Sequence, residues 1–198
     1  RRRRASHFFL SCCFTSLHDP RRARQSGMRY PAAAIPLPGN FCARHPFDNG
    51  ELTIRDELLA ETPREPAGIR QHIADYYAMI SQQDHHMGRL VGWLDRLGLG
   101  ENTLVIYTGD HGLAVGRHGL MGKQNCYEHA MRIPLIMRGP GVPVRTVRSA
   151  LCYGFDLFRI LCDLIGIPIP TSVEGHSFLP VLSGDESAGR SGVYGVYM

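Results

Sequence analysis

The sequence has almost no lysine: of its 22 lysine and arginine residues, only Lys123 is a lysine. It also lacks any run approaching the ~20 apolar residues that a membrane-spanning helix needs. Its six cysteines include no Cys-x-x-Cys pair and are irregularly spaced, so their pattern implies neither a zinc site nor a disulfide framework. What remains is a chain of 198 residues, 43% hydrophobic and 20% charged, which is long enough for a globular domain with a core.

The positive charge is concentrated at the start of the chain. The formal net charge is +4, yet without the arginines of the first 24 residues the chain would be net negative. These arginines are Arg1, Arg2, Arg3, Arg4, Arg21, Arg22 and Arg24. Nucleic-acid binding would need a basic face interleaved with aromatic side chains across the fold, and the sequence shows none. We therefore predict no nucleic-acid partner and a solvated basic terminus over 1–7.

Apolar elements follow this terminus in a regular order. Residues 8–14 form an apolar run that we predict to be a buried strand. Residues 19–65 contain many prolines and glycines, and we predict that they form a long loop. Apolar residues recur at helical spacing over 66–97, with a proline near the start and glycines after the end. The short apolar run at 104–107 is typical of a strand covered on both faces, and a further short strand is predicted at 133–137.

The remainder of the chain continues this pattern. A second helix is predicted over 153–164, ended by Gly166, and a further strand over 193–197. Strands that alternate with helices indicate an α/β fold with a mostly parallel central sheet flanked by helices. We predict a single domain over 1–198.

The segment 103–142 carries the candidate chemistry. An apolar run ends in Gly109-Asp110-His111-Gly112, and in open α/β sheets ligands bind at the carboxyl ends of strands. A carboxylate beside an imidazole can hold a divalent cation, whereas an isolated turn aspartate more often bonds its own backbone. The downstream segment from Gly116 to Lys123, which contains Gly-Arg-His-Gly, favours a site, because a lone ammonium there can bind an anionic substrate oxygen.

Two histidines extend this candidate site. His18 follows the predicted first strand and precedes Asp19 and Pro20, a position suited to a proton donor. His118 lies between Arg117 and Gly119, where it could contact substrate. A loop histidine bonded to backbone is the alternative for both, just as a surface lysine is the alternative for Lys123.

Taken together, these motifs resemble the sulfatase family of the alkaline-phosphatase-like superfamily. The resemblance runs from Phe8 to about Asp185 and includes several segments in the family's order. They are Phe8-Phe9-Leu10, His18-Asp19-Pro20, 75–80, Thr108-Gly109-Asp110-His111-Gly112, 116–123, Tyr127-Glu128, 132–136, 163–167 and 173–182.

The resemblance implies a role for each candidate residue. Asp110 and His111 would supply half the ligands of a divalent cation, usually calcium, although imidazole also suits manganese or zinc and many relatives have asparagine at the position of His111. Lys123 and His18 would contact the sulfate group and act in catalysis, and His118 would contact substrate. The implied substrate is a small-molecule or saccharide sulfate ester, and the implied location is periplasmic or extracellular.

Two family features are absent from the sequence. Sulfatases convert the Cys or Ser of a Cys/Ser-x-Pro-x-Arg motif into formylglycine, their nucleophile, and no such motif occurs here. The paired aspartates that complete the family's metal site are also missing. We therefore expect a catalytic domain incomplete at both ends, in which 183–198 begins a truncated C-terminal part.

The sequence leaves more than one function open. The first is hydrolysis of sulfate esters or sulfamates by the complete protein, with the chain alone inactive. The second is a phosphodiester or phosphonate ester hydrolase of the same superfamily, because tetrahedral sulfate and phosphate groups need similar positive partners. The third is a non-catalytic remnant that binds metal weakly or not at all.

Overall fold

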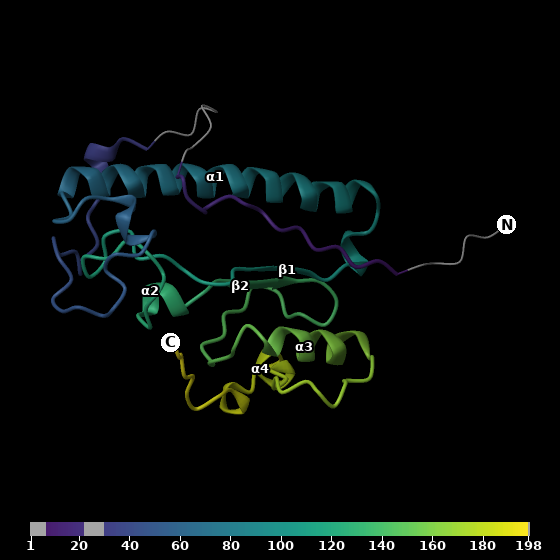
Figure 1. Ribbon diagram of the computed structural model, residues 1–198. Coiled ribbons are helices and arrows are strands. Elements are labelled where there is room, and N and C mark those ends of the chain that lie inside the picture. Colours follow the sequence, from purple (N-terminus) through teal and green to yellow (C-terminus); the bar gives the residue numbers. More distant parts are fainter. Residues whose placement is uncertain (1–6, 22–29, 198) are drawn as a thin grey trace.

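A computed structural model describes residues 7–21 and 30–197. A long helix lies on one side of a small sheet, and two shorter helices lie on the other side (Figure 1). The helices are α1 (Pro66–Arg96), α2 (Glu128–Met131), α3 (Asp156–Ile165) and α4 (Leu179–Ser183), the strands are β1 (Val105–Thr108) and β2 (Leu135–Arg138), and the 3₁₀ turns are Ala32–Ala34, Glu57–Leu59, Gly100–Asn102 and Glu186–Ala188.

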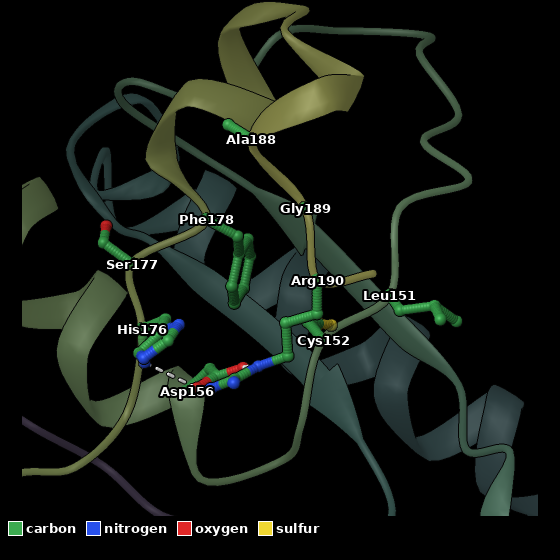
Figure 2. Close-up of a pocket in the computed structure, with 9 residues that line it drawn as sticks. All are labelled: Leu151, Cys152, Asp156, His176, Ser177, Phe178, Ala188, Gly189 and Arg190. Atoms are coloured by element: carbon green, nitrogen blue, oxygen red, sulfur yellow. Dashed lines mark hydrogen bonds and ion pairs between the residues drawn. The ribbon is translucent and has the colours of Figure 1, made fainter. Parts of the chain in front are cut away.

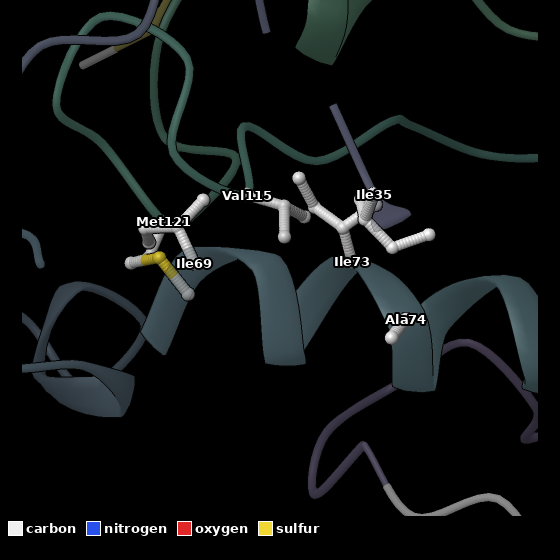
Figure 3. Close-up of a cluster of buried hydrophobic side chains, with 6 residues drawn as sticks. All are labelled: Ile35, Ile69, Ile73, Ala74, Val115 and Met121. Atoms are coloured by element: carbon white, nitrogen blue, oxygen red, sulfur yellow. The ribbon is translucent and has the colours of Figure 1, made fainter. Parts of the chain in front are cut away.

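Helix α1 packs against the segment that carries the candidate chemistry. It begins at Pro66, where a missing N–H costs no hydrogen bond, and spans Pro66–Arg96 against the predicted 66–97. Its buried side chains Ile69, Ile73 and Ala74 belong to one core cluster, which Figure 3 shows. The cluster consists of Ile35, Ile69, Ile73, Ala74, Val115 and Met121. Because Val115 and Met121 belong to the loop after β1, this cluster packs α1 directly against that loop.

The sheet differs from the predicted arrangement. Strands β1 and β2 lie where strands were predicted, but they pair antiparallel, with Val105 opposite Arg138. A mostly parallel central sheet is therefore not confirmed within the described residues. Burial along β2 alternates, with Ile136 63% exposed and its neighbours half-buried, which is the pattern of an antiparallel strand with one covered face.

Helices α3 and α4 cover the half-buried face of β2, where Leu135 and Met137 pack against them. Ile160 of α3 is fully buried and forms a second core cluster with Phe178 and Val181. Gly166 ends α3 with a φ of 70°, a left-handed conformation that glycine adopts at low cost. Within the described part of the chain, no helix is both long and apolar enough to cross a membrane.

The predicted strands at 8–14 and 193–197 are wrong. Neither segment has strand structure, and Phe9 and Tyr194 are 86% and 85% exposed. An apolar run becomes a strand only where a neighbour satisfies its backbone groups, and no described segment pairs with either run.

Candidate active site

Three of the predicted site residues lie together at the end of β1. The Nζ atom of Lys123 lies 2.8 Å from Nε2 of His111, and that nitrogen lies 3.4 Å from Oδ2 of Asp110. Nδ1 of His111 lies 3.1 Å from the carbonyl oxygen of Gly112, which can only accept, so Nδ1 carries the ring hydrogen. Nε2 is then free to accept from the ammonium of Lys123.

The loop between His111 and Lys123 folds back on itself, which explains the contact between them. The N–H of Ala114 donates to the carbonyl of Gly122 at 3.0 Å, and that of Gly116 donates to Leu120 at 2.8 Å. The N–H of Gly112 donates to Ala130 of α2 at 2.8 Å, so the loop is also attached to that helix. We call residues 112–123 the site loop.

His18 lies outside this cluster. Its side chain is 55% exposed, and its Nδ1 lies 2.9 Å from the carbonyl oxygen of Asp19 and 3.2 Å from the Asp19 carboxylate. Among the described residues it has no contact with Lys123, so the structure does not bring the two predicted catalytic groups together directly. The exposed ring of His18 remains accessible to a ligand.

A chain of polar contacts nevertheless connects the two segments. The carboxylate of Asp19 pairs with Arg55, whose Nη1 donates to Asp56 at 3.1 Å. The other oxygen of Asp56 accepts from Nε2 of Gln124 at 3.1 Å, and Oε1 of Gln124 accepts from the N–H of Lys123 at 3.0 Å. The loop of His18 and the site loop are therefore fixed relative to one another by side chains from the irregular segment before α1.

His118 is built into the wall of the site loop. Its Nε2 lies 2.9 Å from the amide nitrogen of Asn40, and its ring stacks on Tyr127 at 4.2 Å between centroids. Its backbone has a φ of 54°, and its carbonyl accepts from Nδ1 of His45 at 2.8 Å. These contacts favour the structural alternative for His118, since both its ring face and its Nε2 are already engaged.

His129 of α2 completes this group of rings. Its Nε2 is buried and has no hydrogen-bond partner within the described residues. Burial, and to a smaller extent the nearby His118 and Arg117, together lower the pKa of His129 from its ordinary value of 6.5 to about 4. His129 is therefore neutral at physiological pH.

This shift predicts a loss of stability in mild acid. Between pH 6.5 and about pH 4 the unfolded chain binds a proton at His129 that the folded chain does not, so stability falls as pH falls through that window. Because the ring is only half-buried, we expect a loss on the order of 1–2 kcal/mol. Urea unfolding across this pH range measures it. His129→Gln should flatten the slope, whereas His85→Gln, on the exposed face of α1, should leave it unchanged.

Sequence reasoning missed a buried ion pair beneath the site loop. Glu57 and Arg64 are only 4% and 3% exposed, and Nη2 of Arg64 donates to Oε2 of Glu57 at 2.5 Å. The carboxylate of Glu57 also accepts the backbone N–H groups of Met121 and Gly122, each at 2.8 Å. Both charged residues lie in the segment predicted to be a long loop. That segment has no hydrophobic periodicity from which a buried position could be predicted.

A second polar cluster lies on the α3 side and lines a cavity of about 60 Å³ (Figure 2). Asp156 accepts from Nε and Nη2 of Arg190 at 2.9 and 2.6 Å, and from the N–H groups of Tyr153 and His176 at 2.8 and 2.7 Å. Burial alone would raise the pKa of Asp156, but these hydrogen bonds outweigh it and lower the pKa. None of the predicted site residues lines this cavity, and the cluster attaches the C-terminal segment to α3.

The donors near Lys123 fit only part of a divalent-cation site. Asp110 and His111 lie close enough to face one cation, and the Asp110 side chain is 88% exposed. Calcium, however, takes six to eight oxygen ligands. Nε2 of His111 already accepts from Lys123, and within residues 7–21 and 30–197 no group of three or more His, Cys, Asp or Glu side chains could hold a metal. Among the described residues, Asp110 and His111 thus supply two of the ligand positions that such a site needs.

Comparison with known proteins agrees with the motifs. Arylsulfatase K of Bos taurus is 33% identical over 151 residues, which cover 76% of this chain and 27% of that protein. N-acetylglucosamine-6-O-sulfatase of Bacteroides thetaiotaomicron is 33% identical over 117 residues, which cover 59% of this chain and 21% of that protein. The chain thus spans about a quarter of the length of these relatives.

A solved structure gives the same relationship in three dimensions. The phosphonate monoester hydrolase of Silicibacter pomeroyi superposes with a TM-score of 0.65 and 29% identity, over 78% of this chain and 33% of that one. The sulfatase family model matches residues 2–167. With the match spanning more than half of its residues, and with Asp110, His111 and Lys123 gathered at the end of β1, the chain belongs to the sulfatase family.

Proposed function

We propose that this chain is the part of a sulfatase catalytic domain that binds the sulfate group, in an enzyme that hydrolyses sulfate esters or sulfamates of small molecules or saccharides. The observation that carries the proposal is the cluster of Lys123, His111 and Asp110 in a chain of this family. The named activity of the Bacteroides relative, on a 6-O-sulfated amino sugar, supports a saccharide sulfate as substrate. The family resemblance is also the sole ground on which we propose a periplasmic or extracellular location.

Each residue has a distinct role in this proposal. The ammonium of Lys123 binds an oxygen of the sulfate group and stabilises the negative charge that develops there as the ester bond breaks. His18 donates a proton to the leaving oxygen, a role for which its exposed ring is accessible. His118, predicted as a substrate contact, has its ring stacked on Tyr127, so we assign it the role of orienting the site loop at the edge of the substrate site. The motif that carries the family's nucleophile does not occur in this sequence, so the roles proposed here are those of binding the sulfate group and donating a proton.

Asp110 and His111 are proposed as two ligands of a divalent cation, calcium first and manganese or zinc as alternatives. When bound, such an ion would offset negative charge on the sulfate oxygens. Nε2 of His111 already accepts from Lys123, so the two groups would have to separate before this nitrogen could hold a cation.

This assignment predicts weak calcium binding by the chain alone. With two ligands, of which one is a nitrogen, we expect a Kd of about 1 mM or weaker by calorimetric titration. Asp110→Asn should abolish even that binding, whereas Asp84→Asn, a change at an exposed carboxylate on α1, should not alter it. Micromolar affinity in the unaltered chain would contradict the two-ligand assignment.

The function is tested by turnover. Because the nucleophile motif is absent, we expect the isolated 198-residue chain to show no hydrolysis of an aryl sulfate. The longest natural polypeptide that contains this chain should hydrolyse it, and should lose that activity when Lys123 is replaced. Robust turnover by the isolated chain would contradict the assigned roles, and no turnover by either form would favour a non-catalytic remnant.

A phosphonate ester hydrolase is the second candidate. It is favoured by the superposition on the Silicibacter enzyme, whose name assigns it that activity. A single ammonium and a divalent cation suit a tetrahedral phosphonate as well as a sulfate. Measuring kcat/KM for matched aryl sulfate and aryl phosphonate esters with the same polypeptide would decide between them.

A further inference from the structure

We propose that Glu57 is a positioning residue for Lys123, acting through the backbone of the site loop. The proposal rests on the proposed function for its consequence in catalysis. The structural part of the proposal is that the buried carboxylate of Glu57 determines where the side-chain ammonium of Lys123 lies. This part can be tested without measuring turnover.

Glu57 holds the two residues that precede Lys123. Its Oε2 accepts the N–H of Met121 at 2.8 Å, and its Oε1 accepts the N–H of Gly122 at 2.8 Å. A carboxylate is the only side-chain group with two acceptor oxygens and no donor, so it can accept two successive N–H groups at once. Charge-assisted hydrogen bonds of this kind are roughly twice as strong as neutral ones.

Arg64 completes the support from the other side. Its Nη2 pairs with the Glu57 carboxylate at 2.5 Å, its Nη1 donates to the Glu57 carbonyl at 2.8 Å, and its Nε donates to the carbonyl of Gly119 at 3.0 Å. A buried ion pair contributes little net stability after the cost of desolvation. Its value here is geometric, because one pair of side chains fixes the site loop at both Gly119 and Gly122.

The glycine before Lys123 leaves room for this arrangement. A Cβ atom at Gly122 would lie 2.8 Å from Oε1 of Gln124, 2.9 Å from Cβ of Asp56 and 3.0 Å from Oε1 of Glu57. Any side chain there would push the carboxylate away from the backbone that it supports. Gly122→Ala is therefore a second, independent way to disturb the same contact.

The consequence reaches the ammonium through a short path. The N–H of Lys123 donates to Gln124 at 3.0 Å, and its Nζ donates to Nε2 of His111 at 2.8 Å. Lysine has a flexible four-carbon stem, so the place of its charge depends on where its backbone is held. While the hydrogen bonds of Glu57 hold the two residues before Lys123, Nζ of Lys123 stays beside His111. When these hydrogen bonds are lost, Nζ moves into solvent.

The single lysine makes a direct test possible. An amine-reactive ester added to the full chain can acylate Lys123 and the α-amino group only, and peptide mass spectrometry separates the two. We expect Glu57→Gln and Gly122→Ala to raise the acylation rate of Lys123 by about tenfold, the equivalent of one lost charge-assisted hydrogen bond. Glu61→Gln, a change at an exposed carboxylate in the same segment, should leave the rate unchanged.

A double-variant comparison separates positioning from general loosening of the fold. His111→Ala removes the acceptor of Nζ directly and should raise the acylation rate by itself. If Glu57 acts through the contact of Lys123 with His111, then Glu57→Gln added to His111→Ala should cause no further increase. Rates that multiply in the double variant, or an unchanged rate in both Glu57→Gln and Gly122→Ala, would overturn the proposal. The acylation rates of the single and double variants do not depend on sulfate hydrolysis. A failure of the proposed function would therefore be distinguishable from a failure of this proposal.

Discussion

Lys123→Ala should lower kcat/KM for a sulfate ester by about 10²–10³-fold, the loss seen when a preorganised donor to a developing oxyanion is removed. Lys123 is the one lysine of the chain, and its ammonium is held 2.8 Å from His111 at the end of β1. The other basic side chains are arginines, whose planar guanidinium is broader and differently hydrated. No nearby residue of the same chemistry can therefore replace the lost charge.

Two comparisons make this expectation sharp. Lys123→Arg keeps the charge but replaces the compact ammonium, proposed to bind a sulfate oxygen, with a broader planar group, so we expect it to recover only part of the lost activity. Arg145→Ala, which removes an exposed cation from a loop, should leave kcat/KM unchanged. Steady-state kinetics on the longest natural polypeptide with this chain provides the measurement. A loss of less than tenfold in Lys123→Ala would remove Lys123 from the mechanism.

The part of the site that sequence predicts is the part encoded locally. Asp110, His111 and Lys123 lie within one short stretch of the sequence. The end of a strand and the glycines that flank Asp110 and His111 predict a sharp turn there. The turn needs only contacts inside the site loop, such as Ala114 to Gly122, to bring Lys123 back to His111. Such short-range closure costs little chain entropy, so the local pattern is sufficient to predict it.

The support of the site could not be predicted in the same way. Glu57 and Arg64 lie in an irregular segment in which no hydrophobic period marks a buried position, and the N–H groups that Glu57 holds are more than 60 residues away. Their burial depends on the fold bringing two distant segments together. His18 shows the same limit, because its relation to Lys123 runs through Arg55, Asp56 and Gln124.

The predicted strands failed where pairing decides the outcome. The runs at 8–14 and 193–197 are as apolar as β1 and β2, yet only β1 and β2 have each other as partners. Periodicity reports which faces a segment can bury but not whether a partner is present. The direction of pairing is equally non-local, which is why the sheet of β1 and β2 is antiparallel where a mostly parallel one was predicted.

The largest effect on stability should come from the second polar cluster. Asp156→Asn keeps the size of the side chain but removes the charge that pairs with Arg190, and we expect the folded state to lose about 3 kcal/mol. Asp156 is 1% exposed and accepts four hydrogen bonds, so the variant leaves a partly buried guanidinium and at least one backbone N–H without an acceptor. For a chain of this length the melting temperature should fall by roughly 10 °C.

The double variant and the pH dependence identify the cause of that loss. Adding Arg190→Met to Asp156→Asn should recover part of the stability, because it removes the charge that the first change left unpaired. Since the folded pKa of Asp156 lies below its ordinary value of 3.8, its contribution is complete above that pH and is lost as pH falls through the folded pKa. Asp156→Asn should therefore flatten the acid limb of the stability curve, while Asp84→Asn leaves it intact. If Asp156→Asn melts within 2 °C of the unaltered chain, a shift of well under about 1 kcal/mol, the ion pair with Arg190 does not hold the C-terminal segment on α3.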